Sequence, residues 1–218
     1  MGRGARSDDN EAMSLRLPLT VALAALASLS MTASALAVGV QDQRAVSHPK
    51  AISQPSRAAT ANTLIAPPAV CPGQGALDAP AEAQEQAMAC MTDFARQRAG
   101  LADLSPAGPL AQSAGDKSDD ILRCDDFSHF ACGREFTYWM TEAGYTSASC
   151  WRVGENLAWG SDAQGTVRSI FEAWMRSPGH RENILGDFAE IGISVRVGAL
   201  GGAPRTRVWA QHFGTHCG

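Results

Sequence analysis

Two histidines and one glutamate are the side chains of this sequence best suited to chemistry. Glu155 stands at the head of a strand-like apolar run, and His180 follows 25 residues later on a helical turn opened by Pro178. His129 lies upstream in a Ser-His pair. Two imidazoles and a carboxylate are enough protein ligands to hold a divalent metal with an open coordination position. We therefore predict that folding brings His129, Glu155 and His180 into one polar site that binds zinc or another divalent cation.

Each of these residues also has a structural alternative. His129 could cap a loop between Cys124 and Cys132, and Glu155 could hold the turn before the strand. His180 could satisfy backbone amides at the start of its helix. For each residue taken alone, both interpretations stay open.

Hydrolysis is the enzymatic alternative, because a zinc-bound water would be deprotonated near neutral pH. The sequence has no His-Glu-x-x-His motif, and Glu155 cannot easily be both ligand and general base. Ser128 and Ser177 lie near the histidines in sequence, but no Gly-x-Ser-x-Gly motif is present. Ser177 is better placed as a helix N-cap before Pro178. Ligand binding is therefore favoured over fast chemistry, and a zinc-dependent hydrolase or peptidase is the alternative.

Apolar periodicity predicts the elements that would position these residues. Helical spacing predicts helices over about 81–100, 109–121, 135–143 and 164–175, with a short helix restarting at Ser177. Strand-like patterns predict strands over 155–159, 191–197 and 208–213, the last two as an antiparallel hairpin. This order favours an α+β fold, an α-β-α sandwich with a central antiparallel sheet flanked by helices.

Lys117 is an anomaly in the second of these helices, because it shares an apolar face with Leu110, Ala114 and Ile121. The simplest interpretation is that its aliphatic stem covers the core while its amine reaches water. The alternative is that the amine points into a polar cavity.

The N-terminal part has the layout of a secretory signal. Arg16 precedes an apolar stretch that ends in the small residues Ala35 and Ala37, which predicts a signal peptide over 1–37, with Met13 as an alternative start. The apolar stretch is short for an uncleaved membrane anchor, so we expect a secreted, extracellular protein without a stable membrane span. Residues 38–81 are rich in Pro, Ala, Ser and Thr, which predicts a flexible linker before a folded domain over 82–218.

All six cysteines lie beyond this predicted signal. In an oxidising compartment an even number favours three disulfides, although about 15 pairings are possible. We favour Cys71–Cys90, which would join the linker to the first helix, and leave the other four cysteines unassigned. A free catalytic thiol is not expected.

The charge pattern disfavours two classes of partner. The net charge is −4, no basic stripe interleaves with aromatic residues, and Lys50 and Lys117 are the two lysines of the chain. Nucleic acid is therefore excluded as an expected partner, and a polybasic membrane surface is disfavoured.

Several motifs in a fixed order resemble the CAP superfamily, the group of cysteine-rich secretory, antigen 5 and pathogenesis-related 1 proteins, and within it the exported bacterial branch. The resemblance covers about residues 84–217. The motifs are FSH at 127–129, GENLAWG at 154–160, W-x-x-S-x-G-H-R-x-N at 174–183, EIGI at 190–193 and HFG at 212–214.

The resemblance implies an α-β-α sandwich with a cleft that holds two histidines and two acids and can bind a divalent cation. His129, Glu155 and His180 match three of these positions, whereas the second acid of the animal members is Ser177 here. The resemblance therefore implies a cleft with one carboxylate fewer and weaker metal affinity. It also implies an extracellular lipid, peptide or glycan as ligand, and we expect a monomer.

Overall fold

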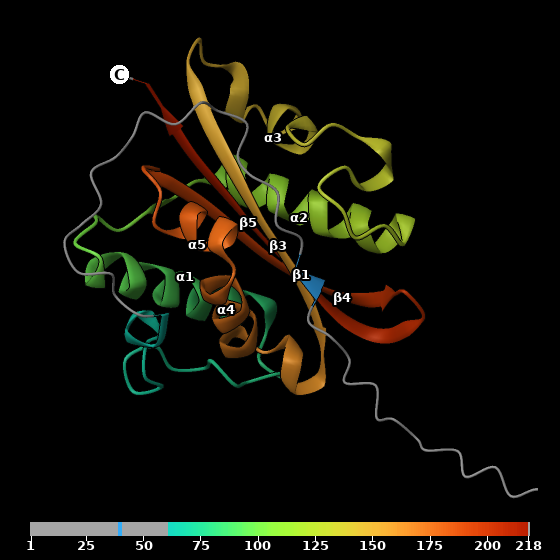
Figure 1. Ribbon diagram of the computed structural model, residues 1–218. Helices are drawn as coiled ribbons and strands as arrows, with labels where there is room; N and C mark the ends of the chain where they lie inside the picture. Colours follow the sequence, from blue (N-terminus) through green and yellow to red (C-terminus); the bar gives the residue numbers. More distant parts are fainter. Residues whose placement is uncertain (1–38, 41–60, 218) are drawn as a thin grey trace, which may run out of the picture. The chain divides into compact units, whose positions relative to one another are not determined.

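A central sheet organises the fold of this chain. The computed structural model describes residues 39–40 and 61–217. In the sheet, the strands follow the order β1-β3-β5-β4-β2 (Figure 1). The long strands are β3 (Trp151–Ser161), β4 (Glu190–Leu200) and β5 (Ala203–His216), and the short ones are β1 (Gly39–Val40) and β2 (Ser105–Pro106).

The sheet is antiparallel along its long strands. β5 pairs with β3 on one side and with β4 on the other, both antiparallel, whereas the short β2 runs parallel to β4. The predicted hairpin of the last two strands is confirmed. The predicted strand 155–159 is longer in the structure, because β3 pairs with β5 over its whole length from Trp151 to Ser161.

Helices cover both faces of the sheet. In Figure 1, α1, α4 and α5 lie on one side, and α2 and α3 lie on the other. Their bounds are α1 Ala81–Arg98, α2 Gly108–Cys124, α3 Tyr138–Glu142, α4 Val167–Arg176 and α5 Pro178–Ile184, with short 3-10 helices at η1 Ala61–Leu64, η2 Ala131–Gly133, η3 Tyr145–Ser147 and η4 Asp162–Gly165. The α+β sandwich predicted from the sequence is confirmed. Among the described residues, no helix combines the length and apolar character that a bilayer span requires.

Each face of the sheet has its own apolar core. On the side of α1, α4 and α5, the buried side chains include Met88, Phe171, Trp174 and Trp209. On the side of α2 and α3, they include Ile121, Trp139 and Leu157. Burial of apolar area on both faces is the main favourable contribution to the fold.

The predicted flexible linker over 38–81 is corrected by the structure in its second half. Leu64, Ala66 and Cys71 are buried against the core of the α1 side. Gln74 is also buried, and its carbonyl accepts a hydrogen bond from the backbone N–H of Arg168 at 3.0 Å. Buried apolar residues, a hydrogen bond from α4 and the disulfide Cys71–Cys90 therefore hold this proline-rich stretch against the domain. The folded unit includes residues from η1 onward, and the predicted signal peptide and residues 41–60 lie outside the described part.

Three disulfides join all six cysteines. They are Cys71–Cys90, Cys124–Cys132 and Cys150–Cys217. The expected number and the expected Cys71–Cys90 pair are confirmed. The first ties the segment before α1 to that helix, and the second closes the short loop that follows α2.

A glycine on β4 allows α2 to lie directly against the sheet. A Cβ atom at Gly192 would lie 2.0 Å from the carbonyl carbon of Leu110 and 2.1 Å from the nitrogen of Ala111. This close approach places the inner face of α2 over β5 and β3, so that polar side chains of α2 reach those of the sheet.

Candidate functional site

A fully buried carboxylate is the centre of the candidate site. Glu155 of β3 is 2 % exposed, and both of its oxygens are hydrogen-bonded to imidazoles. Nδ1 of His129 lies 2.5 Å from Oε1, and Nε2 of His212 lies 2.8 Å from Oε2. Because an ionised carboxylate can only accept, both imidazoles donate. The structure therefore brings His129 and Glu155 into direct contact.

His212 is a site residue that the sequence analysis missed. It lies opposite Glu155 in the register of β3 and β5. The carbonyl of Glu155 accepts a hydrogen bond from Asn183, so the peptide groups of Glu155 face away from β5. Glu155 and His212 therefore form a non-hydrogen-bonded pair, the type of antiparallel pair in which the two side chains lie closest together. His212 is the first residue of the HFG motif. Its role at the site could be recognised only once the pairing of β3 with β5 was known.

Ser113, His212 and Glu155 form a chain of hydrogen bonds with the residue types of a catalytic triad. Oγ of Ser113 lies 2.7 Å from Nδ1 of His212 and 2.9 Å from the carbonyl of Leu110. The Ser113 side chain is 0 % exposed on the inner face of α2. A nucleophile must reach its substrate, and the buried Ser113 hydroxyl cannot. The hydrogen bond between Ser113 and His212 therefore serves to hold the imidazole in place.

The predicted position of the Lys117 amine in water is wrong. Lys117 is 0 % exposed, and its Nζ donates a 2.7 Å hydrogen bond to the carbonyl of His129. The same Nζ lies 3.8 Å from Oε1 of Glu155 and 3.7 Å from the centre of the Trp139 ring. The alternative interpretation, an amine in a polar interior, is the correct one. Burial is tolerated because a carboxylate, a carbonyl and an aromatic face surround the ammonium.

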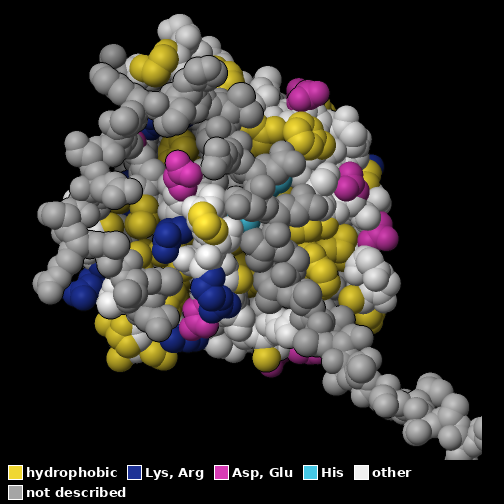
Figure 2. All heavy atoms as spheres, viewed as in Figure 1, with side chains coloured by type: hydrophobic (Ala, Val, Ile, Leu, Met, Phe, Trp, Pro, Cys, Tyr) yellow, Lys and Arg dark blue, Asp and Glu magenta, His cyan; other side chains and the backbone are white. Residues whose placement is uncertain are grey.

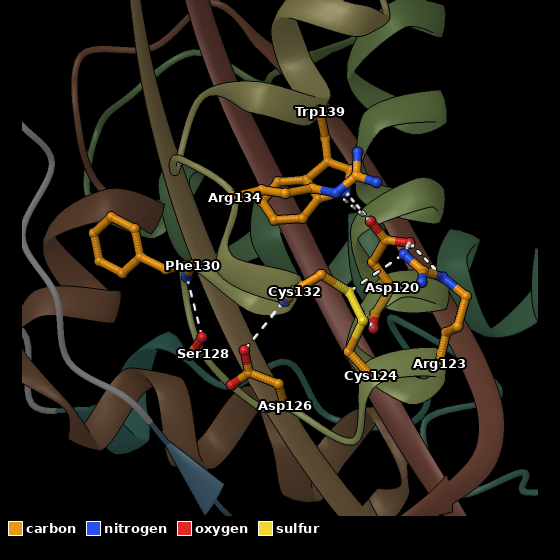
Figure 3. Close-up of a disulfide and its surroundings, with 9 residues drawn as sticks. All are labelled: Asp120, Arg123, Cys124, Asp126, Ser128, Phe130, Cys132, Arg134 and Trp139. Atoms are coloured by element: carbon orange, nitrogen blue, oxygen red, sulfur yellow. Dashed lines mark hydrogen bonds and ion pairs between the residues drawn. A yellow bond between two sulfur atoms is a disulfide. The ribbon is translucent and has the colours of Figure 1, made fainter.

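The loop that carries His129 is tied at both ends. Cys124 at the end of α2 is bonded to Cys132 after the loop, and the backbone N–H of Cys132 donates to Asp126 at 3.1 Å (Figure 3). Within the loop, the backbone N–H of Phe130 donates to Ser128 Oγ at 3.2 Å. His129 is therefore presented by a short, covalently closed loop, which explains how a loop residue can be placed accurately.

The second histidine forms a pair with the serine that replaces the expected acid. Nδ1 of His180 lies 2.8 Å from Oγ of Ser177. Ser177 occupies the N-cap position of α5 as predicted, but its side chain makes no capping hydrogen bond there. Its contact is with the imidazole instead. Ser177 thus orients His180, which the sequence alone did not indicate.

Two asparagines connect α5 to β3. Nδ2 of Asn156 donates to the carbonyl of His180, and Nδ2 of Asn183 donates to the carbonyl of Glu155, both at 3.1 Å. These bonds place His180 beside β3 on the α5 side of the sheet, whereas the side chain of Glu155 faces Lys117 of α2 on the other side. In Figure 2, histidine side chains are visible among hydrophobic side chains near the middle of this face.

The charges around Glu155 favour its ionised form. Burial by itself would raise the pKa of this carboxyl, but the positive charge of Lys117 and the hydrogen bonds from His129 and His212 outweigh burial and lower the pKa to about 2. Burial lowers the pKa of Lys117 to about 8, against the raising effect of the Glu155 charge. Glu155 and Lys117 therefore form a buried ion pair at neutral pH.

This ion pair predicts an acid-dependent loss of stability. A carboxyl whose pKa is lowered by folding stabilises the protein above its unfolded value of about 4.5, and the stabilisation is lost as the pH falls toward about 2. We expect the free energy of unfolding to fall more steeply between pH 4.5 and 2 in the wild type than in Glu155→Gln. Urea unfolding at a series of pH values measures both slopes, and equal slopes would contradict the assignment.

Comparison with known proteins identifies the family. A family model for the cysteine-rich secretory protein family, named CAP, matches residues 91–213. The chain belongs to the CAP family. The match includes the motifs that hold His129, Glu155, His180 and His212, so the site described above lies within the CAP domain.

Bacterial relatives agree with this assignment. The uncharacterised protein YkwD of Bacillus subtilis is 32 % identical over 132 residues, which are 60 % of this chain and 47 % of that protein. An extracellular SCP-domain protein of Bacillus anthracis superimposes with a TM-score of 0.50 at 21 % identity, over 61 % of this chain and 40 % of that one. The chain thus spans about half the length of these relatives, and the structural likeness concerns the fold.

The surroundings of Glu155 do not favour its carboxylate as a metal ligand. Both oxygens of Glu155 already accept hydrogen bonds, and the Lys117 ammonium 3.8 Å away would repel a cation. His129 and His180 each contact a neighbour through Nδ1. Among the residues that the structure describes, no three His, Cys, Asp or Glu side chains are arranged to hold an ion.

Proposed function

We propose that this chain is an exported CAP protein that binds an extracellular ligand at the site formed by His129, Glu155, His180 and Ser177. The observation that supports this most is the buried Glu155 carboxylate, whose two oxygens are engaged and which fixes the orientation of His129. Such an arrangement holds the imidazole of His129 in a fixed orientation. His129 and His180 are themselves only 3 % and 2 % exposed, so in this proposal the ligand meets the narrow exposed edge of each ring. It suits recognition of a polar group on a small lipid, peptide or glycan.

A divalent cation is a second ligand of the same site in this proposal. His129 and His180 would be its ligands, while Glu155 and Ser177 orient the two rings through their Nδ1 atoms. Zinc accepts imidazole ligands readily, and a metal bound there would supply a Lewis acid to the site. With two imidazoles and no free carboxylate, we expect affinity below that of a complete metal centre.

The hydrolase alternative has less support. Glu155, the acid that would act as general base, is already shared between two imidazoles and a lysine. The Ser113 hydroxyl of the triad-like chain is buried. Binding therefore remains the proposed function.

Zinc is expected to raise the melting temperature of the purified protein, and His180→Ala should abolish this response. At a zinc concentration about 100 times the Kd, binding to the folded state adds about 2.7 kcal/mol of stability, which is roughly 5–10 °C for a chain of this size. His216→Ala is the matched control, because this imidazole lies at the end of β5 near Tyr145 and Glu190. Differential scanning calorimetry over a zinc titration measures all three.

An unchanged melting temperature in the wild type over the whole titration would contradict the metal site. A response that His180→Ala retains and His216→Ala loses would place the zinc elsewhere. Untargeted lipid, peptide and metal analysis of the natively secreted protein, with His180→Ala beside it, tests the ligand itself. A compound that co-purifies with the wild type and is lost from the variant is the expected result.

A further inference from the structure

On the edge of β3 that faces away from β5, helix side chains donate hydrogen bonds to the backbone carbonyls of two residues. They do not reach the next outward-facing residue. Edge strands expose unpaired N–H and C=O groups unless something covers them. Asn183 donates to the carbonyl of Glu155, and the indole N–H of Trp174 donates to the carbonyl of Leu157, both at 3.1 Å. Peptide groups on one edge of a strand alternate, so the next residue facing outward is Trp159.

A short N-terminal strand pairs with β3 at this open position. β1 is antiparallel to β3, with Gly39 opposite Trp159 and Val40 opposite Ala158 (Figure 1). Since the peptide groups of Trp159 face outward, Gly39 is the residue of β1 that exchanges hydrogen bonds with it. The N–H of Val40 then points away from β3.

β1 lies immediately after the predicted signal cleavage point. Cleavage of the predicted signal after Ala37 would make Val38 the first residue of the mature protein, one residue before β1. Valine favours extended backbone, the conformation that strand pairing requires. The 20 residues over 41–60 that join β1 to η1 can span at most about 72 Å, which is ample for a domain of this size.

We propose that the edge of β3 at Ala158–Trp159 is a peptide-docking site whose occupant is the mature N-terminus of the same chain, residues Gly39–Val40. Because β1 is antiparallel to β3, its C-terminal end points toward the end of β3 that carries Glu155. Docking therefore places the N-terminal end of β1 at Trp159, on the side of this contact away from Glu155. It does not depend on the ligand-binding function proposed above.

Amide hydrogen exchange of the exported full-length protein tests this docking. Gly39→Pro removes the N–H that faces Trp159, whereas Val40→Pro removes one that faces away. We expect exchange in the segment 157–161 to be about tenfold faster in Gly39→Pro than in the wild type. Val40→Pro should match the wild type, and exchange in β4 should be unchanged in both variants.

A synthetic peptide of residues 38–46 added to Gly39→Pro should restore the protection of 157–161, and a scrambled peptide should not. Equal exchange in all three proteins, or protection that depends on protein concentration, would overturn docking within one chain. The zinc response of the same samples is measured in parallel. A normal zinc response with unchanged exchange would reject the docking and leave the proposed function intact.

Discussion

Lys117→Met is expected to lower the free energy of unfolding by about 3–5 kcal/mol, because it leaves the buried Glu155 carboxylate without its counter-ion. The ammonium is 0 % exposed and also donates to the carbonyl of His129, so the variant loses that hydrogen bond as well. Methionine has a similar length and fills the space beside Trp139. The change therefore removes charge rather than volume, and equilibrium urea unfolding at pH 7 measures it.

Two further variants separate the charge effect from general damage. Arg176→Met removes one of two arginine partners of Glu172, an exposed i,i+4 pair at 3.6 Å, and should cost less than about 1 kcal/mol. Glu155→Gln added to Lys117→Met removes the uncompensated charge and should recover part of the loss. If Lys117→Met is as stable as Arg176→Met, the buried ion pair is not formed in solution.

Gly192→Ala is the second substitution for which we expect a large effect, about 3 kcal/mol or more. The added methyl group would lie 2.0 Å from the backbone of Leu110, and backbone atoms of α2 can only give way if the helix moves. That movement would separate Ser113 from His212 and Lys117 from Glu155. The zinc-dependent rise in melting temperature should therefore shrink together with stability.

Gly108→Ala is the matched control, since a Cβ atom there meets nothing within 4 Å. It lies at the start of α2 and should change stability by no more than about 0.5 kcal/mol. Thermal and urea unfolding of both variants measure the difference. Equal stability of the two variants would show that α2 does not need the close approach at Gly192.

The candidate site shows where local patterns were sufficient and where they were not. His129 and Glu155 were found from residue type and motif order, and they are in direct contact. His212 was missed because its role depends on which residue of β3 it faces. A shift of one residue in strand register would turn its side chain to the opposite face of the sheet.

Lys117 and the segment 61–80 illustrate the same limit. A lysine on an apolar helix face normally extends to water, and only the neighbouring carboxylate, carbonyl and indole make its burial possible. The segment before α1 has the composition of a linker, yet Leu64, Ala66 and Cys71 are buried. Composition averages over a segment, whereas docking depends on a few side chains that meet a complementary surface.

By itself, the sequence determined the helices, the last two strands, the α+β class and the family. It also determined the disulfide Cys71–Cys90 and the two residues, His129 and Glu155, of the hydrogen bond at the centre of the site. These follow from periodicity, motif order and residue type, which are properties of short stretches of chain. Only the tertiary structure decided that Lys117 and His212 meet at Glu155, that Ser177 orients His180 and that Trp174 and Asn183 close the edge of β3. Those contacts join residues far apart in sequence, so they exist only once strand pairing and the approach of α2 at Gly192 have set the distances between elements.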